Sequence, residues 1–155
     1  MSETQNPIDQ IQLPENYSFV DREDISPEEI VAVRKSTGWE AGDTEEGWRQ
    51  NLDTALAVVA VCEDTTSELV GMGFLVGNRR HAILCDFNVR PEHQGKGIGT
   101  AILRRRMQIA DQELKIPFLY TSLAATNPLK ESYKSLGFTA TGENYFRDGT
   151  THTPA

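Results

Sequence analysis

The strongest constraint on the fold is a change of hydrophobic periodicity at a glycine-rich segment. Before it, apolar runs span residues 56–62, 69–76 and 82–89, with turn-forming clusters at 64–67 and 77–80 between them. This spacing predicts an antiparallel meander of three strands. After residue 97 the apolar residues recur at helical spacing, which predicts an amphipathic helix over about 97–115. The glycine-rich segment is therefore predicted to connect a strand directly to a helix.

The segments before the meander predict a strand and two helices. Residues 17–20 form a short candidate strand. Ser26 to Glu29 is a capping box with proline at the first helical position, which predicts a helix that buries Ile30, Val31 and Val33 and ends at Gly38. A second helix is expected after Asp43 or Thr44, with Trp48 and Leu52 on it.

The segments after the long helix predict a further strand at 117–125, a short helix at 128–136 that ends at Gly137, and one or two closing strands at 138–146. Helices before, within and after a mixed sheet favour the α/β or α+β class and exclude a helix bundle or a β-sandwich. The 155 residues suit a single domain. Residues 1–16 and 148–155 are expected to be loose termini.

The net charge of −8 opposes binding to nucleic acid or to an anionic membrane and would attract a cationic substrate. The N-terminus has no basic segment followed by an apolar run, so we expect a cytoplasmic protein. The two cysteines, Cys62 and Cys85, lie in apolar runs. Two reduced, buried thiols are expected there, and a disulfide or a reactive thiol is the alternative.

Residues 94–100, called the glycine loop below, are suited to bind phosphate. Gly95, Gly97 and Gly99 alternate with other residues and lead straight into a helix, so backbone N–H groups can approach a ligand closely. A helix start carries about half a positive charge, to which Gln94 can add a neutral donor and Lys96 a cation. A glycine-rich turn without any ligand is the alternative.

The glycine spacing fits neither of two common nucleotide loops. A Walker loop needs Gly-Lys-Ser/Thr after four intervening residues, whereas Lys96 stands between glycines here. A dinucleotide fingerprint needs a gap of two residues after its second glycine, and Gly97 and Gly99 leave only one. A general nucleotide-binding domain is therefore disfavoured.

The segment Gln94-Gly95-Lys96-Gly97-Ile98-Gly99, placed after a strand, resembles the Q/R-x-x-G-x-G/A motif of the GNAT superfamily of N-acetyltransferases. The resemblance extends to the meander before the motif and to the later segment that runs from Asn127 to Tyr133 and ends in Gly137-Phe138. It covers roughly residues 17–147. The segment 34–39 and Asp86 resemble a subgroup of small bacterial members whose amine substrates are undefined.

The resemblance implies a mixed, mostly antiparallel central sheet flanked by helices. It also implies that the strand with Phe87 and Val89 splays from the strand near residues 119–123, so that free backbone groups bind the pantetheine arm of acetyl-CoA. The coenzyme contacts that it implies are Phe87, Asn88, Val89, Gln94, Gly95, Lys96, Gly97, Ile98, Gly99, Thr100 and Asn127.

The implied reaction transfers the acetyl group to a primary amine of a small molecule or peptide, by direct attack in a ternary complex. An amine with a pKa of about 10.4 must first lose a proton. Asp86 is the only acidic residue at 82–89, so it is the candidate base, water-holder or amine anchor, with a structural role as the alternative. Several relatives carry a glutamate just before it, where Cys85 stands here, so proton loss either involves Asp86 directly or passes through water.

Tyr133 matches the family position that protonates or hydrogen-bonds to the leaving thiolate. It also falls on an apolar helical stripe with Leu129 and Leu136, so a core role is the alternative. Trp39 and Trp48 lie where family members cover the acceptor, and either residue could instead belong to the core. A non-catalytic acyl-CoA-binding module remains the alternative function.

Further expectations concern metals, charged residues and partners. His81, His93 and His152 show no metal-ligand spacing, so no metal is expected, and His93 is expected merely to occupy the loop. Arg104, Arg105 and Arg106 are expected on the solvated face of the long helix, with one of them a candidate for a coenzyme phosphate. A homodimer is compatible with the resemblance.

Overall fold

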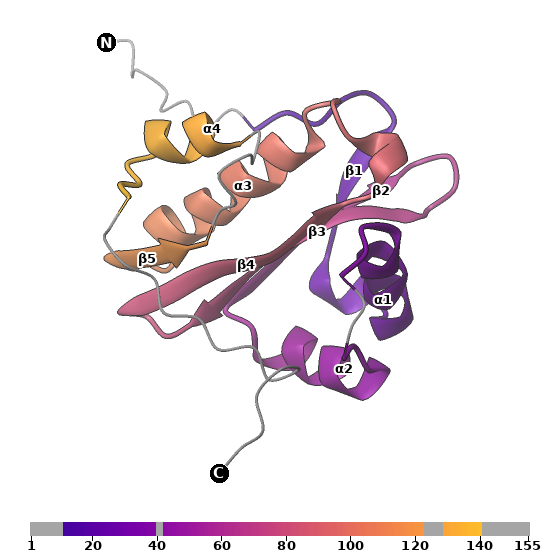
Figure 1. The fold of residues 1–155 in the computed structure, drawn as a ribbon, viewed down its shortest axis with the longest axis horizontal. Coiled ribbons are helices and arrows are strands. Elements are labelled where there is room, and N and C mark those ends of the chain that lie inside the picture. Colours follow the sequence, from indigo (N-terminus) through magenta and orange to yellow (C-terminus); the bar gives the residue numbers. More distant parts are fainter. Residues whose placement is uncertain (1–10, 40–41, 123–128, 141–155) are drawn as a thin grey trace. The chain divides into compact units, whose positions relative to one another are not determined.

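The structure, a computed structural model, describes residues 11–39, 42–122 and 129–140. The chain divides into two compact units, Met1–Ser122 and Leu123–Ala155. Within the described residues, the first unit contains the whole central sheet and the glycine loop (Figure 1). In the described part of the chain, no helix has the length and the apolar character needed to span a bilayer.

The central sheet has five strands in the order β1-β2-β3-β4-β5. The strands are β1 (Tyr17–Val20), β2 (Ala57–Glu63), β3 (Leu69–Gly77), β4 (His81–Val89) and β5 (Phe118–Thr121). The first four pair antiparallel and β5 pairs parallel to β4. This arrangement confirms the predicted meander and the mixed, mostly antiparallel sheet.

Two capped helices follow β1, as the sequence predicts. In α1 (Pro27–Ser36), the Ser26 hydroxyl accepts a hydrogen bond from the Glu29 N–H at 3.2 Å. In α2 (Glu45–Thr54), the Thr44 hydroxyl accepts from the Gly47 N–H at 3.0 Å. These side chains satisfy backbone donors that a helix start leaves without an intrahelical partner, which explains where both helices begin.

Helices cover both faces of the sheet, with α1 and α2 on one side and α3 (Ile98–Gln108) on the other (Figure 1). The first face packs apolar residues of α1 and α2 against β2 and β3, among them Ile30, Trp48 and Phe74. The second face packs Ile98 and Ile102 of α3 against strand residues. After α3 the chain makes a single π-helical segment, Ile109–Glu113. The long predicted helix is thus confirmed, with a wider final turn.

Arg106 corrects the expectation that three successive arginines lie on the solvated face of the long helix. Its side chain is fully buried, and Nη1 donates to the Phe74 carbonyl at 3.2 Å. The guanidinium also lies 5.4 Å from the centre of the Phe87 ring. Position 106 follows Ile102 and Leu103 by four and three residues, so the helical period places it on the buried face.

Gly73 makes room for this arginine in the opposing strand. A Cβ atom at Gly73 would lie 2.6 Å from the Arg106 Nε. Real Cβ atoms do not approach other heavy atoms so closely, so a side chain at Gly73 would require the buried Arg106 guanidinium to shift. The prediction for Arg106 was wrong because the sequence alone does not show that Gly73 of the facing strand leaves space for its side chain.

The second unit is described only at residues 129–140. Helix α4 (Lys130–Ser135) occupies most of the predicted segment, and Tyr133 on it is 3 % exposed. The Tyr133 ring packs edge to face on Phe138, with centroids 5.5 Å apart. Residues 138–140 form no regular element, and the remainder of the predicted closing strands lies outside the described residues. Of the predicted strand at 117–125, the structure forms β5 and describes no residue beyond 122.

Candidate functional site

A bulge in β4 places a carboxylate at the centre of the candidate site. Met72 pairs with Asn88 and Phe74 pairs with Cys85, so β4 holds one more residue than β3 between these pairs. Asp86 within this bulge has a φ of 51°, a left-handed conformation that is uncommon for a residue with a side chain. Bulges re-aim side chains and are frequent next to active sites. As a result, Cys85 packs on the α1 and α2 core while its neighbour Asp86 also reaches Arg34 of α1.

The edge of β4 next to β5 becomes free at the same place. The parallel pairing of β4 with β5 ends at Leu84 and Thr121, although β4 continues to Val89. Within the described residues, no strand pairs with Cys85 to Val89 on that side. Backbone groups of Phe87 and Val89, two of the predicted coenzyme contacts, therefore lie on an open stretch of strand. Unpaired backbone N–H and C=O groups are strong hydrogen-bonding groups for an extended ligand.

The glycine loop follows this open stretch and starts α3. Gly95 has a φ of 76° and Gly97, the N-cap of α3, has a φ of 87°. A Cβ atom at either position would meet no heavy atom within 4 Å, so the space beside the loop is open. The Ala101 N–H makes the first hydrogen bond of the helix, to the Gly97 carbonyl at 3.1 Å. Ile98, Gly99 and Thr100 come before Ala101, and the N–H groups of such first residues have no acceptor within the helix.

The electrostatics of the helix start favour an anion. The first turn of α3 contains no acidic side chain, so no carboxylate of the helix competes for its N–H groups. The aligned peptide dipoles add about half a positive charge. Lys96 stands directly before the N-cap residue Gly97. The loop can therefore bind a phosphate or diphosphate through backbone donors and one cation.

Gln94 has a more structural place than the sequence suggested. Its side-chain amide donates to the Val89 carbonyl at 2.9 Å and thereby ties the glycine loop to the end of β4. The Lys96 ammonium donates to the Tyr17 hydroxyl at 3.3 Å.

Asn88 is 5 % exposed, and its side-chain oxygen accepts from the Thr37 hydroxyl at 2.7 Å. The side chain of Asn88 thus fastens β4 to the end of α1.

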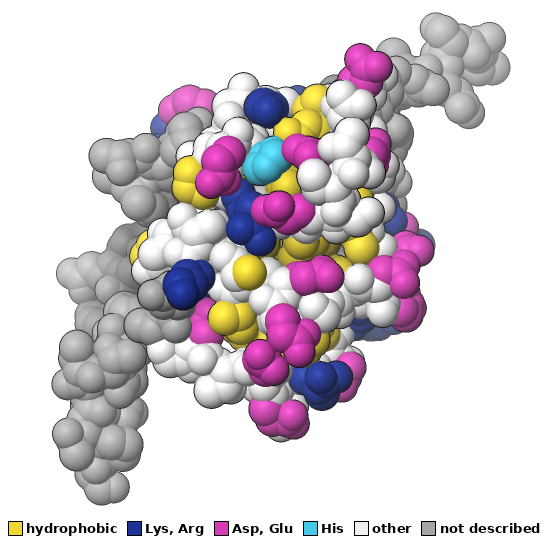
Figure 2. Space-filling model, turned by 90° about the vertical axis from the view of Figure 1, so that its right-hand side faces the viewer, with side chains coloured by type: hydrophobic (Ala, Val, Ile, Leu, Met, Phe, Trp, Pro, Cys, Tyr) yellow, Lys and Arg dark blue, Asp and Glu magenta, His cyan; other side chains and the backbone are white. Residues whose placement is uncertain are grey.

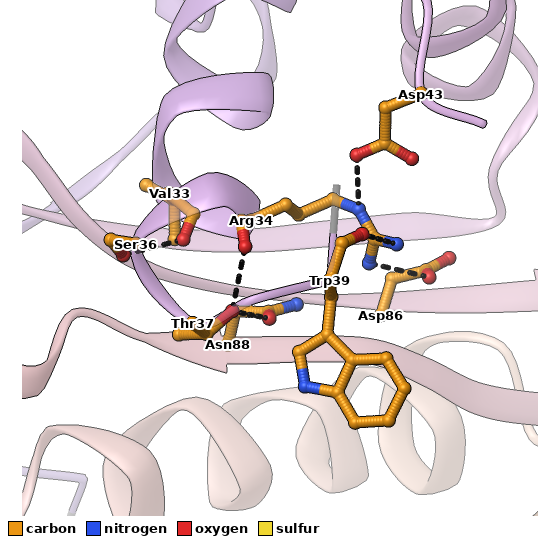
Figure 3. Close-up of polar contacts among 8 residues, drawn as sticks. All are labelled: Val33, Arg34, Ser36, Thr37, Trp39, Asp43, Asp86 and Asn88. Carbon is orange, nitrogen blue, oxygen red and sulfur yellow. Dashed lines mark hydrogen bonds and ion pairs between the residues drawn. The ribbon is translucent and has the colours of Figure 1, made fainter. Parts of the chain in front are cut away.

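Arg34 connects the acidic residues around the bulge (Figure 3). Its Nε lies 2.6 Å from Oδ2 of Asp43, and its Nη2 donates to the Trp39 carbonyl at 2.6 Å. Its Nη1 reaches Oδ1 of Asp86 at 3.4 Å, which is near the limit for a hydrogen bond. The shorter contacts, to Asp43 and to the Trp39 carbonyl, fix the position of the guanidinium. The Asp86 carboxylate can therefore still accept hydrogen bonds from a ligand. The Asp86 side chain is 34 % exposed and can receive a ligand.

The two tryptophans predicted at the acceptor site have different surroundings. Trp39 is 67 % exposed and stands in front of Arg34 and Asp86, with its backbone held by the arginine (Figure 3). Trp48 is 5 % exposed, packs on Phe74 with centroids 5.4 Å apart and lies under the Arg34 guanidinium. The structure therefore brings Trp39 to the site surface and places Trp48 in the supporting core.

Both cysteines have raised pKa values. Burial and the neighbouring charge of Asp86 raise the pKa of Cys85 to about 12, although Cys85 is the first residue of the open edge of β4. Burial likewise raises the pKa of Cys62. Both residues are free thiols, and the sequence contains no other cysteine. A thiol with a raised pKa carries little thiolate near neutral pH and is a poor nucleophile.

The remaining predicted site residues, Tyr133 and Asn127, both lie in the second unit. Tyr133 is buried on α4 within that unit, and Asn127 lies outside the described residues. Among the described residues, no group of three or more His, Cys, Asp or Glu side chains could hold a metal ion.

Sequence reasoning missed Arg34 and Asp43 as site residues. The signal was present in the conspicuous segment from Arg34 to Trp39. Its link to Asp86 spans 52 residues and depends on the bulge in β4. Tyr17, which contacts Lys96 of the glycine loop, was also missed, and His93 was expected merely to occupy the loop, because their contact joins residues 76 positions apart.

Comparisons with known proteins agree with this geometry. No curated protein is significantly similar to the chain in sequence. A structure from meticillin-resistant Staphylococcus aureus, described as a probable acetyltransferase of unknown function, is 24 % identical with a TM-score of 0.67, covering 85 % of this chain and 99 % of that one. A GNAT-family acetyltransferase from Streptococcus pneumoniae is 20 % identical with a TM-score of 0.66, covering 84 % and 98 %. Glucosamine-6-phosphate N-acetyltransferase from Arabidopsis thaliana is 10 % identical with a TM-score of 0.68, covering 87 % and 99 %.

These identities establish a shared fold, and the family follows from the sequence itself. The family model for the acetyltransferase (GNAT) domain matches residues 22–155, which include α1, the β4 bulge, the glycine loop and the second unit. The structure agrees with this match, since it contains a mixed sheet, an open edge of β4 and a glycine loop at the start of α3. The chain belongs to the GNAT family of acetyltransferases.

Proposed function

We propose that this protein is an N-acetyltransferase that transfers the acetyl group of acetyl-CoA to a primary amine of a small molecule or peptide. The observation that supports the proposal most directly is the succession of three features along one stretch of chain. Asp86 stands in the bulge, no described strand pairs with the edge of β4 from Cys85 to Val89 on the β5 side, and the glycine loop starts α3.

The chemistry of these groups fits acetyl-CoA, the co-substrate of GNAT acetyltransferases. The diphosphate of a coenzyme needs donors and positive charge, which the N–H groups at the start of α3 and Lys96 supply. Its amide-containing arm needs backbone partners, which the open edge of β4 offers. The positive φ values of Gly95 and Gly97 and the open space beside them allow the close approach of a ligand to the backbone.

Asp86 is the residue proposed to receive the amine. An amine acceptor arrives as a cation at neutral pH and must lose one proton before its nitrogen can attack the acetyl carbonyl carbon. The partly exposed carboxylate of Asp86 can hold the ammonium and accept this proton directly or through a water molecule. A C–N bond then forms, the C–S bond breaks and the nitrogen releases its second proton. The sulfur takes up one proton, so that the products are an amide and the coenzyme thiol.

The charges around Asp86 favour an acceptor of positive charge. Arg34 already contacts Asp43, Asp86 and the Trp39 carbonyl, so its cation is shared by two carboxylates. The face of the molecule shown in Figure 2 carries many acidic side chains with fewer basic ones among them, which agrees with the net charge of −8. Such a field raises the local concentration of a cationic substrate.

Direct transfer in a ternary complex is proposed over an acetylated enzyme. Transfer through a cysteine would need a thiolate, and the pKa of Cys85 is raised to about 12. Tyr133 is proposed as the group that protonates or hydrogen-bonds to the leaving sulfur, on the basis of its position in the family motif.

The proposal is tested by the release of coenzyme thiol from acetyl-CoA in the presence of a panel of primary amines. We expect amine-dependent release and intersecting initial-velocity lines, whereas parallel lines would contradict a ternary complex. Binding of coenzyme A without turnover of any amine would instead support an acyl-CoA-binding module. No binding of coenzyme A at all would refute the proposal.

Two variants assign the proton-transfer roles in this assay. Asp86→Asn and Tyr133→Phe are each expected to lower kcat by about 10-fold to 10⁴-fold, with the affinity for acetyl-CoA nearly unchanged. Asp53→Asn removes an exposed aspartate from α2 and serves as the matched control. A kcat equal to that of the control would remove the substituted residue from the mechanism.

A further inference from the structure

A hydrogen bond ties the entrance of the glycine loop to the first strand. The hydroxyl of Tyr17 in β1 lies 2.7 Å from Nδ1 of His93, which ends the short helical turn Pro91–His93. The two rings meet edge to face, with centroids 5.6 Å apart. Only 15 % of the His93 side chain is exposed, so the contact is largely shielded from water. It joins segments that are 76 residues apart in the sequence.

The same hydroxyl also contacts the cation of the glycine loop. The Lys96 Nζ donates to it at 3.3 Å and lies 5.8 Å from the centre of the Tyr17 ring. An ammonium group can only donate, so the Tyr17 oxygen accepts from Lys96. In the His93 tautomer with its proton on Nε2, the Tyr17 hydroxyl donates to Nδ1. Lys96, Tyr17 and His93 thus form a chain of hydrogen bonds, with Tyr17 in the middle.

Glu63 borders this chain without replacing Tyr17 in it. Glu63 is the cross-strand partner of Tyr17 in β2, and its Oε2 lies 3.8 Å from His93 Nδ1, beyond hydrogen-bond reach. Its Oε1 accepts from the Thr65 hydroxyl at 2.9 Å. The link between β1 and the loop therefore depends on the Tyr17 hydroxyl.

The loop is braced on two sides as a result. Gln94 ties it to the Val89 carbonyl in β4, while His93 and Lys96 tie it to Tyr17 in β1. A lysine side chain loses much rotamer freedom when it is fixed. Holding Lys96 before a ligand arrives removes part of this entropic penalty from the binding step, which strengthens binding.

We infer that Tyr17 and His93 are positioning residues for the coenzyme diphosphate, which hold the glycine loop and the Lys96 ammonium in their binding arrangement. The inference rests on the proposed function, because it takes the glycine loop as the diphosphate site. Tyr17 lies before residue 22, where the match to the family model begins.

The inference is tested by the affinity of the full chain for coenzyme A, measured by calorimetry, and by acetyl-transfer kinetics. Tyr17→Phe removes the hydroxyl and keeps the ring, and His93→Leu removes the acceptor. Each is expected to weaken coenzyme A binding by about 3- to 30-fold. Because both substitutions remove the same hydrogen bond, the double variant should bind coenzyme A no more weakly than the single variant with the lower affinity. His93→Asn keeps an acceptor near the position of Nδ1 and should restore most of the affinity.

A matched control separates positioning from general damage. Ser18 is the neighbour of Tyr17 in β1, and its hydroxyl donates to Asp64 at 2.6 Å on the exposed surface. Ser18→Ala should leave the affinity unchanged. For Tyr17→Phe, the KM for acetyl-CoA should rise while kcat and the KM for the amine stay within about twofold. Amide exchange in β1 should slow when coenzyme A binds to the wild type, and much less in Tyr17→Phe.

The outcomes distinguish this inference from the proposed function. Wild-type affinity in both Tyr17→Phe and His93→Leu would overturn the positioning role and leave the acetyltransferase proposal intact. An equal loss of kcat and of amine affinity would also overturn it, since that pattern indicates general disruption. A wild-type chain that does not bind coenzyme A would overturn both. If Tyr17→Phe fails to fold, the comparison of His93→Leu with His93→Asn decides the question.

Discussion

Replacement of Arg34 by methionine should lower the free energy of unfolding and weaken the acceptor site together. The side chains of Arg34 and Asp43 are 14 % and 9 % exposed, and their closest atoms are 2.6 Å apart. Methionine keeps much of the aliphatic packing on Trp48 and removes every polar contact of the guanidinium. The carboxylate of Asp43 would then remain buried without its cation, and the Trp39 carbonyl would lose a donor at 2.6 Å.

The magnitude follows from the burial of the pair. Breaking a buried ion pair costs about 3–5 kcal/mol, and the residual exposure of both partners lowers this to about 2–4 kcal/mol. For a chain of this size the corresponding fall in Tm is about 4–16 °C. Asp43→Asn leaves Arg34 with its other partners and should cost only about 1–2 kcal/mol. In the double variant the two losses should not add, because neither charge is left alone.

Urea unfolding of the wild type, the two single variants and the double variant measures this coupling directly, with an expected value of about 1–3 kcal/mol. Arg105→Met is the matched control. Arg105 pairs with Glu113 at 3.3 Å, and their side chains are 33 % and 52 % exposed. The loss from this control should stay below about 1 kcal/mol.

The functional part of the prediction concerns Trp39. Without the guanidinium, the Trp39 backbone loses its hydrogen bond and Asp86 loses a partner at 3.4 Å. We expect the KM for the amine to rise by about tenfold or more while coenzyme A affinity changes little. An Arg34→Met chain that unfolds within about 0.5 kcal/mol of the wild type, or strictly additive losses in the double variant, would refute the reasoning.

Three further predictions follow from single features of the first unit. The raised pKa of Cys85 keeps the folded thiol protonated after the unfolded thiol ionises near its ordinary value of 9.0, so stability should fall as pH rises above 9. Relative to Cys85→Ala, the wild type should lose about 1 kcal/mol in urea unfolding between pH 8 and pH 10, and parallel curves would contradict the raised pKa. Gly97→Ala should cost about 1–2 kcal/mol, because the φ of 87° is unfavourable for alanine, and calorimetry should show coenzyme A affinity reduced by at least about tenfold. Gly73→Ala should destabilise the fold by about 1–3 kcal/mol through the contact of its Cβ with Arg106, and Arg106→Met should relieve part of that loss in urea unfolding. Equal losses from Gly73→Ala with and without Arg106→Met would show that the two residues do not depend on each other.

The elements that the sequence predicted are those set by interactions between near neighbours. The Ser26 capping box, the turn clusters of the meander and the Gly97 start of α3 each depend on groups a few residues apart. The order of these elements was therefore readable along the chain. The change from α-helical to π-helical hydrogen bonding at Ile109 was not predicted.

The prediction that Arg106 is exposed to solvent was wrong, although the helical period of the neighbouring apolar residues already indicated a buried position. A run of three arginines suggested a solvated face, yet the helical spacing from Ile102 places position 106 in the core. Only the facing strand explains how a guanidinium is accommodated there. Gly73 leaves the space, the Phe74 carbonyl accepts a hydrogen bond, and the Phe87 ring lies against the cation.

The amino-acid sequence by itself determined the family motif, and it singled out the glycine loop as a candidate phosphate site and Asp86 as the only acidic residue at 82–89. The tertiary structure alone decided which residues hold these groups. Arg34 meets Asp86 across 52 residues and Tyr17 meets His93 across 76. Such contacts depend on strand register and on the extra residue in the β4 bulge, where a shift of one position turns each side chain to the opposite face of the sheet.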